Sequence, residues 1–116
     1  MVEFSNSIVD RVNVLKVQGA LQQPAVEEFY DRMEAAAPIG NIDTLVVDCT
    51  NLTKISSWGM RALCLAHKDL KHRGQQMMIA GLTGDVRETF QISGVDSLLN
   101  LCDDVETALG ECNAGT

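Results

Sequence analysis

Aromatic and basic residues are both scarce in this sequence of 116 residues. Three Phe, one Tyr and one Trp make up 4% of the chain, so the core is expected to be aliphatic and rich in sulphur, with five Met. The chain has nine Lys and Arg but sixteen Asp and Glu, which gives a net charge of −7. Such a surface repels phosphate backbones and anionic lipids, so no nucleic-acid partner and no membrane insertion are expected. A partner with a basic surface is expected instead.

Metal-binding and catalytic patterns are also missing. The four cysteines form no C-x-x-C pair, so no zinc or thioredoxin-type site is expected, and Cys49 and Cys64 are interpreted as small buried hydrophobic residues. The segment GLTGDV at 81–86 lacks the Lys and the spacing of a P-loop. Cys64 and His67 lie three apart on one helical face, but no third residue orients them as nucleophile and base. We therefore expect no metal, no cofactor and no enzymatic activity.

The N-terminal segment is not expected to be a signal peptide. Its first ten residues, MVEFSNSIVD, lack the basic and apolar segments of a signal peptide. No apolar run along the chain approaches the length that a bilayer requires. We expect a cytoplasmic protein with reduced thiols.

Hydrophobic periodicity predicts an alternation of strands and helices. Strands are expected over 2–8, 11–19, 44–49, 75–81 and 97–102, and helices over 23–36, 57–72, 85–93 and 103–110. The run TLVVDC is too short for a helix and suits a strand covered on both faces, whereas TNLTKI after it is interpreted as a loop. The order β-β-α-β-α-β-α-β-α predicts a single α/β domain over residues 1–116, with a mostly parallel sheet of four to five strands and about four helices. Residues 111–116 are expected to form a flexible tail.

Local signals also predict where the helices begin and end. The predicted ends are Pro38 and Gly40 for the first helix, Gly74 for the second, Gly94 for the third and Gly110 for the fourth. The predicted cap-like pairs at helix starts are Asp85 with Glu88 and Asp103 with Glu106.

The segment KISSWGM at 54–60 places two serines and the only Trp at the entrance of the helix over 57–72. Either Ser56 or Ser57 can be the N-terminal cap, but a cap needs one hydroxyl and the other remains. Free N–H groups and the helix dipole favour an anion there, so the fold would tolerate a phosphorylated Ser57 while its surface changed. Trp58 is either a core or half-buried residue or, with Met60, part of a docking face.

Four pieces occur in order along the chain: VLKVQGAL, TLVVDCTNLTKISSWGM, LKHRGQQMMIAGL and VRETFQISGVDSLLNLCDDVETAL. As an ordered set, from about residue 12 to residue 109, they resemble the STAS family, the domain of bacterial anti-sigma factor antagonists and of sulphate-transporter tails. The central family motif is Asp-Ser-x-Gly followed by an aliphatic residue, and it reads here Ser56-Ser57-Trp58-Gly59-Met60. Two acidic family positions differ: the motif Asp is Ser56, and an Asp that often follows the first G-x-L is Gln22.

The resemblance implies a phosphorylation switch in transcription regulation. By position the phosphoacceptor is Ser57, with Ser56 as the second choice. The implied partners are an anti-sigma factor of the histidine-kinase-like ATPase type, which phosphorylates the serine, and a PP2C-type phosphatase, which reverses the reaction. The unphosphorylated antagonist captures the anti-sigma factor and frees a sigma factor, which is called partner switching.

The residues expected to contribute to partner binding are Ser56, Trp58, Gly59, Met60, Asp48 and Gln22. For Asp48, a role in bracing the loop and a plain Asx-type cap are equally open. An alternative function also stays open: a STAS scaffold that is never phosphorylated and binds a transporter or stress complex constitutively.

Overall fold

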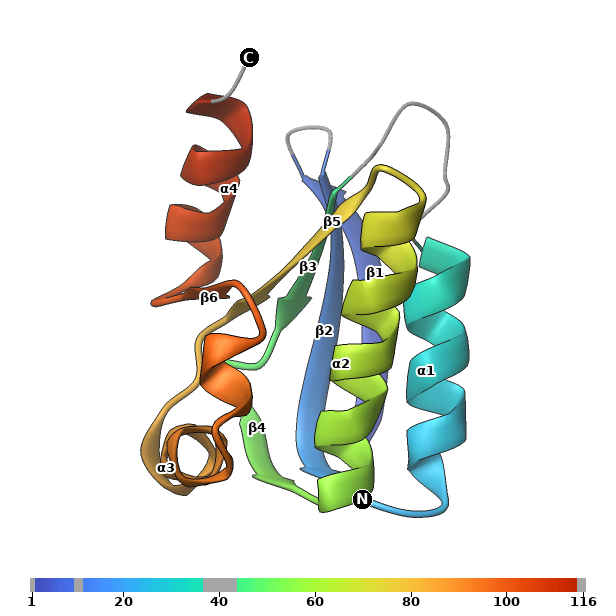
Figure 1. Cartoon of the computed structure of the whole chain (residues 1–116), viewed down its shortest axis with the longest axis vertical. Coiled ribbons are helices and arrows are strands. Elements are labelled where there is room, and N and C mark those ends of the chain that lie inside the picture. The colour runs from blue at the N-terminus through green and yellow to red at the C-terminus, as the bar shows by residue number, and fades with distance from the viewer. Residues whose placement is uncertain (1, 10–11, 37–43, 115–116) are drawn as a thin grey trace.

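The computed structural model describes residues 2–9, 12–36 and 44–114 (Figure 1). Its elements are β1 (Glu3–Val9), β2 (Val12–Leu21), α1 (Ala25–Ala36), β3 (Thr44–Asp48), β4 (Leu52–Ile55), α2 (Ser57–His72), β5 (Gln76–Ala80), α3 (Gly84–Ser93), the 3₁₀ turn η1 (Val95–Ser97), β6 (Leu101–Cys102) and α4 (Val105–Ala114). None of the helices in these ranges is long and apolar enough to cross a lipid bilayer.

Five strands follow one another in the sheet in the order β1-β2-β3-β5-β6, and β4 pairs with the far end of β2. β1 is an antiparallel edge strand, whereas the other pairs are parallel. Parallel neighbours need crossover connections, and the helices between the strands supply them. The predicted α/β class, with a mostly parallel sheet and four α-helices within the described residues, is confirmed.

One strand, β4, is not predicted by the sequence pattern. It runs parallel to β2, with Ala20 opposite Lys54 and Leu21 opposite Ile55, after a shift of register beyond Gly19. Gly19 has a φ of 93°, a conformation that costs little only for glycine. β4 carries the chain from β3 to the entrance of α2, and it therefore fixes that entrance beside the end of β2.

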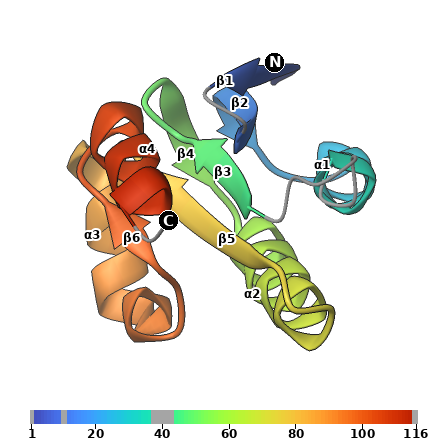
Figure 2. The same ribbon diagram turned by 90° about the horizontal axis from the view of Figure 1, so that it is seen from above.

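The sheet has a core on each face. Helices α1 and α2 lie side by side on one face, and α4 lies on the opposite one (Figures 1 and 2). The alternation of β2 explains both, because Leu15 and Val17 belong to the core with α1 and α2, while Val12 and Val14 belong to a smaller core with α4. β3 is buried over four of its five residues, as its unbroken apolar run predicts.

Two predicted helix ends are confirmed, and the predicted caps at two helix starts are corrected. Gly74 and Gly94, both with positive φ, follow α2 and α3 as predicted. At the start of α3 the N-cap is Thr83, so Asp85 lies within the first turn and is not the cap. At the start of α4 the carboxylate of Asp104, rather than Asp103, accepts a hydrogen bond from the Thr107 backbone N–H at 2.7 Å.

The last helix is longer than predicted. α4 continues through Gly110 to Ala114, so residues 111–114 of the predicted tail are helical. A helical glycine costs only about 1 kcal/mol relative to alanine, which neighbouring residues readily offset. Residues 115–116, and the Pro38 and Gly40 predicted to end the first helix, lie outside the described residues.

Candidate functional site

Ser56 is the cap of α2. Its backbone is extended, with φ −82° and ψ 166°, and its Oγ accepts a hydrogen bond from the Gly59 N–H at 3.1 Å. Its own N–H donates to the Leu21 carbonyl at 2.9 Å, which ties the helix entrance to the end of β2. The structure therefore assigns the capping role, which the sequence leaves open between two serines, to Ser56.

Ser57 is the first residue of α2, and its side chain is exposed. Its hydroxyl makes no hydrogen bond to a residue that the structure describes. The first turn contains no acidic residue, so the positive end of the helix dipole is not neutralised there. A phosphoacceptor must be reachable and able to carry new negative charge, and the surroundings of Ser57 satisfy both conditions. Phosphorylation of Ser57 itself stays a prediction.

Trp58 lies outside the core, with 57% of its surface exposed. The guanidinium carbon of Arg61 lies 6.0 Å from the centre of the indole ring, a cation–π geometry. A large exposed aromatic side chain of this kind often anchors protein interfaces. The structure therefore excludes Trp58 from the core.

Gly59 and Met60 were expected to contribute to partner binding, but both are buried and do not lie on the exposed face. Met60 is 8% exposed, and Ser93 Oγ lies 3.6 Å from its sulphur. Gly59 is buried against the end of β4, and a Cβ at this position would lie 2.8 Å from Ile55 Cγ1. These two residues seat the first turn of α2 on the sheet, so they can influence a partner only through the position of Ser57 and Trp58.

Gln22 and Asp48 have different relations to the helix entrance. Gln22 is exposed and follows Leu21, whose carbonyl binds the Ser56 N–H, so its loop adjoins the Ser57 loop. Asp48 lies at the other end of β4, and four extended residues span about 13 Å. Its Oδ1 accepts hydrogen bonds from the Thr50 N–H at 3.0 Å and the Thr50 hydroxyl at 2.6 Å. Asp48 is thus the Asx-type cap of the β3–β4 turn.

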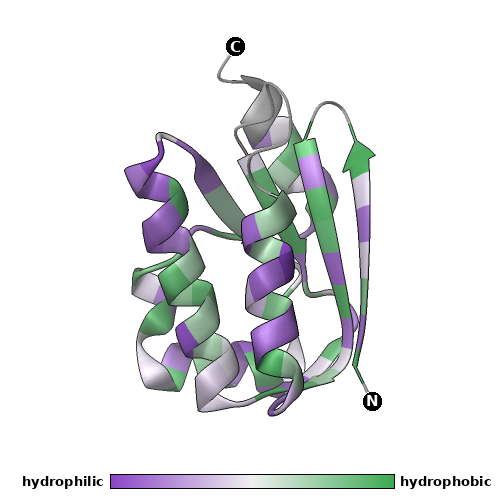
Figure 3. Cartoon of the chain, turned by 90° about the vertical axis from the view of Figure 1, so that its right-hand side faces the viewer, coloured by the Kyte–Doolittle hydropathy of each residue, from purple (hydrophilic) through white to green (hydrophobic). Residues whose placement is uncertain are grey.

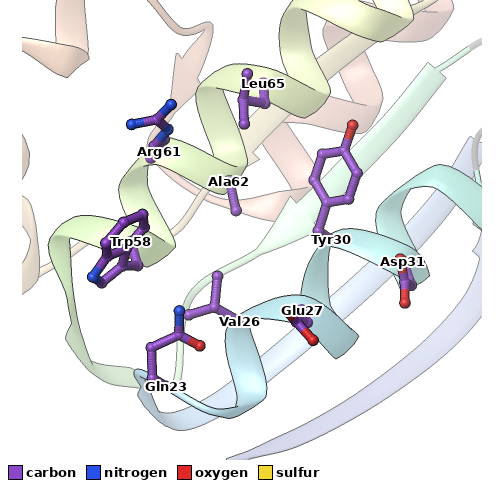
Figure 4. Close-up of a pocket in the computed structure, with 9 residues that line it drawn as sticks. All are labelled: Gln23, Val26, Glu27, Tyr30, Asp31, Trp58, Arg61, Ala62 and Leu65. Atoms are coloured by element: carbon purple, nitrogen blue, oxygen red, sulfur yellow. The ribbon is translucent and has the colours of Figure 1, made fainter.

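A groove of about 480 Å³ runs between α1 and α2 from the Ser57 end (Figure 4). Trp58 lies at one end of it, and Leu65, which is 44% exposed, lies further along α2. Hydrophobic and hydrophilic residues alternate along the outward face of the two helices (Figure 3). The sequence carries a signal for this strip, because Trp58 and Leu65 are seven residues apart on α2 and lie off its buried stripe. Leu65 and Arg61 were not among the predicted site residues.

Beyond the groove, a polar cluster joins α1 to α2. The Tyr30 hydroxyl donates a short hydrogen bond to Asp69 and lies 3.5 Å from Glu34 Oε1, which also pairs with Arg73 at 2.9 Å. The hydrogen bond to Asp69, together with burial and the negative charge of Glu34, raises the pKa of Tyr30 to about 12. The cluster holds the two helices in register, so the width of the groove is fixed by side-chain contacts.

The thiol and imidazole groups do not form a reactive pair. Burial raises the pKa of the Cys64 thiol and, with the charge of Lys71, lowers the pKa of His67. Burial raises the pKa of Cys49 to about 12. A nucleophilic cysteine requires the opposite shift, toward the thiolate. Across the described ranges, no group of three or more His, Cys, Asp or Glu side chains is placed to hold a metal ion.

A model of the STAS domain matches residues 3–108, and the chain belongs to this family. Among its relatives is BtrV of Bordetella bronchiseptica, assigned by name as an anti-sigma factor antagonist. It is 28% identical over 100 residues, which cover 86% of this chain and 85% of BtrV.

Solved structures show the same fold. An anti-sigma factor antagonist from Mycobacterium paratuberculosis aligns with a TM-score of 0.85 at 17% identity, over 96% of this chain and 93% of that one. The anti-sigma factor antagonist SpoIIAA in its unphosphorylated form aligns at 0.80 and 21% identity, over 97% of both chains. The phosphorylated form of Bacillus SpoIIAA aligns at 0.71 and 21% identity, over 95% of this chain and 99% of that one.

Proposed function

We propose that the chain is an anti-sigma factor antagonist that acts in the cytoplasm and is switched by phosphorylation of Ser57. Its partner is an anti-sigma factor of the histidine-kinase-like ATPase type, and a PP2C-type phosphatase removes the phosphate. The names of BtrV and of the two aligned antagonist structures support the class of function. The existence of SpoIIAA in a phosphorylated form supports a phosphate switch on this fold.

One observation carries the assignment to Ser57: its hydroxyl is exposed at the positive end of α2, while the adjacent Ser56 is occupied as the cap. The kinase would transfer the γ-phosphoryl group of ATP to Ser57 Oγ and release ADP. The product carries roughly −1.5 to −2 charge beside a helix N-terminus that stabilises it. The domain stays folded, while the local charge of the docking face around Ser57 becomes negative.

The switch turns docking off through the nucleotide. A kinase that phosphorylates Ser57 must place nucleotide phosphates against it, so a phosphorylated Ser57 would face the phosphates of ADP. The phosphate on Ser57 and the phosphates of ADP are both negatively charged, and they repel each other strongly when water is excluded between them. The unphosphorylated hydroxyl has no such repulsion, and it allows the complex to form.

The test is phosphorylation by the cognate ATPase with ATP, followed by intact-mass analysis. We expect one added phosphate on the wild-type protein and none on Ser57→Ala. The matched control is Ser7→Ala, an exposed serine on β1, which should be phosphorylated like the wild type. Ser56→Ala should still be phosphorylated on Ser57, although it loses about 1 kcal/mol of stability with the cap.

Two results would contradict the proposal. Phosphate uptake by Ser57→Ala but not by Ser56→Ala would move the acceptor to Ser56. Stable binding of the ATPase without any phosphate uptake, independent of ATP, would favour the alternative of a constitutive STAS scaffold.

A further inference from the structure

The groove between α1 and α2 begins at the proposed phosphoacceptor and continues away from it. The two helices lie side by side and begin at the same end of the molecule, because each follows a strand of the parallel sheet (Figure 1). Trp58 and Gln23 lie at that end of the groove, and Leu65 and Asp31 lie further along it (Figure 4). A partner that covers Ser57 therefore meets an open groove directly beside it.

The groove has an apolar strip that no described residue covers. Trp58 and Leu65 are 57% and 44% exposed, and between them Ala62 and Val26 form a buried floor. Seven residues of helix span about 10 Å, or two turns. A groove between two helices accepts the side-chain ridge of a third helix, with anchors spaced at i, i+3 or i+4, and i+7.

The charges along the groove differ on its two sides. On the α1 side, Glu27 and Asp31 lie four residues apart, and neither forms an ion pair with a described residue. Their neighbours on the same helix are paired, Glu28 with Arg32 at 3.1 Å and Glu34 with Arg73 at 2.9 Å. Like charges at this helical spacing repel, so a cation placed between Glu27 and Asp31 would relieve a cost already present.

On the α2 side, the only charged lining residue is Arg61. A ligand of the groove is thus expected to be basic toward α1, apolar toward the floor, and neutral or acidic toward Arg61. A small apolar molecule would leave Glu27 and Asp31 unpaired, and an acidic segment would be repelled by them.

We propose that this groove receives a basic amphipathic helix of the anti-sigma factor. The proposal rests on the proposed function and extends its interface by two helical turns beyond Ser57. The groove and Ser57 then have separate tasks: the groove supplies apolar and charge-complementary contact, and Ser57 decides whether the nucleotide site of the partner is tolerated. Leu65 lies about 12 Å along α2 from Ser57, so the two contacts can be tested separately.

The test measures the dissociation constant for the cognate kinase-type anti-sigma factor, loaded with ADP, by titration calorimetry. One groove variant is Leu65→Asp, and its matched control is Ile92→Asp, which places the same charge on an exposed apolar residue of α3. We expect Leu65→Asp to weaken binding about tenfold or more, as loss of an interface anchor does, and Ile92→Asp to leave it within about twofold.

The second groove variant is the double change Glu27→Lys/Asp31→Lys. Its control is Glu88→Lys/Glu106→Lys, which changes the net charge equally at exposed positions of α3 and α4. The groove variant should bind about tenfold more weakly and lose most of the salt dependence of the wild type, and the control should do neither. Thermal denaturation of each variant confirms that the fold is retained.

Three results would contradict this inference. If both groove variants bind like the wild type while Ser57→Asp loses binding, the groove is not contacted, and only this inference fails. If the wild type does not bind the anti-sigma factor at all, the proposed function fails with it. If Leu65→Asp instead abolishes a concentration-dependent dimer in sedimentation, the groove is occupied by a second copy, and the inference is wrong.

Discussion

At the scale of single residues, two adjacent serines occupy different chemical environments. The Ser56 hydroxyl accepts a backbone N–H and is committed to the helix start. The Ser57 hydroxyl, one residue later, lies exposed at the same helix end. Stability and chemical modification therefore depend on different side chains, so each can be changed without the other.

Arg61 is expected to respond to a phosphate on Ser57. The two residues lie at i and i+4 of α2, where opposite charges attract, and Arg61 at present lies over Trp58. In protein carrying phosphoserine at position 57, a ³¹P NMR titration should give a phosphate pKa a few tenths of a unit lower with Arg61 than with Arg61→Gln. Arg87→Gln on α3 is the control. Equal pKa values in all three proteins would show that Arg61 does not reach the phosphate.

Gly59 is predicted to be required for the seating of α2. Gly59→Ala would place a methyl group 2.8 Å from Ile55 Cγ1 and 3.3 Å from Leu21 Cδ2. We expect a net loss of about 1–2 kcal/mol in urea denaturation, because overpacking outweighs the helical preference for alanine. Gly110→Ala in α4 is the matched control, since nothing lies within 4 Å of its added methyl group. That change should stabilise the protein by up to about 1 kcal/mol; equal effects of the two changes would contradict the packing argument.

At the scale of elements, α1 and α2 act as one unit. Their contact is apolar near the sheet and ends in the cluster of Tyr30, Glu34, Asp69 and Arg73 on the outside. Tyr30 is the only tyrosine of the chain, so its titration in ultraviolet absorbance reports on this cluster alone.

The Tyr30 cluster makes stability depend on alkaline pH. The pKa of Tyr30 is raised from 10.0 to about 12 in the folded protein, because the neutral phenol donates to Asp69. A group whose pKa is raised by folding contributes its full stability below pH 10.0, and that contribution is lost as the pH rises toward about 12. Asp69→Asn should return the observed pKa toward 10.0 and flatten the loss, whereas Asp85→Asn should not. An unchanged pKa in Asp69→Asn would mean that the hydrogen bond is not its cause.

The helices and strands were predictable from sequence to different degrees. α2 was predicted with its observed bounds, because Met60, Leu63 and Leu70 form a strong stripe and Gly74 supplies a local end signal. β4 was not predictable, since only Leu52 and Ile55 of its four residues are buried. Its strand conformation depends on pairing with β2 beyond a register shift, which is a non-local contact.

The candidate site was predictable in its chemistry but not in its shape. The pattern of Ser56, Ser57 and Trp58 shows that one hydroxyl is spare, but whether a residue near the start of α2 faces the core depends on how the helix packs on the sheet. That packing buries Met60 and leaves Trp58 exposed. The groove was missed for the same reason, because it exists only where α1 lies beside α2.

At the scale of the whole molecule, the two faces of the sheet are protected unequally. The larger core contains residues of α1, α2 and α3, whereas the smaller one has α4 as its only helix within the described residues. Val46, Met78 and Ala108 are buried in the smaller core. The far face therefore depends on a single helix near the C-terminal end.

Ala108 is predicted to be a sensitive position in that smaller core. Ala108→Asp would bury an unpaired carboxylate against Val46 and Met78, at a cost of about 3 kcal/mol or more in chemical denaturation. The control is Gly110→Asp, an exposed position of the same helix with nothing within 4 Å of its added Cβ, which should change stability by no more than about 0.5 kcal/mol. A similar small loss for both variants would show that α4 can leave the sheet at little cost.

Trp58 gives the molecule a natural optical reporter. All indole emission of this chain comes from one side chain, one residue from the proposed acceptor and at the mouth of the groove. A binding event that shields this ring from water shifts the wavelength of its fluorescence emission, and the measurement needs no added dye. Binding elsewhere on the surface, such as at β1 or α4, leaves the emission wavelength unchanged, so the fluorescence shows whether the face around Trp58 has been covered.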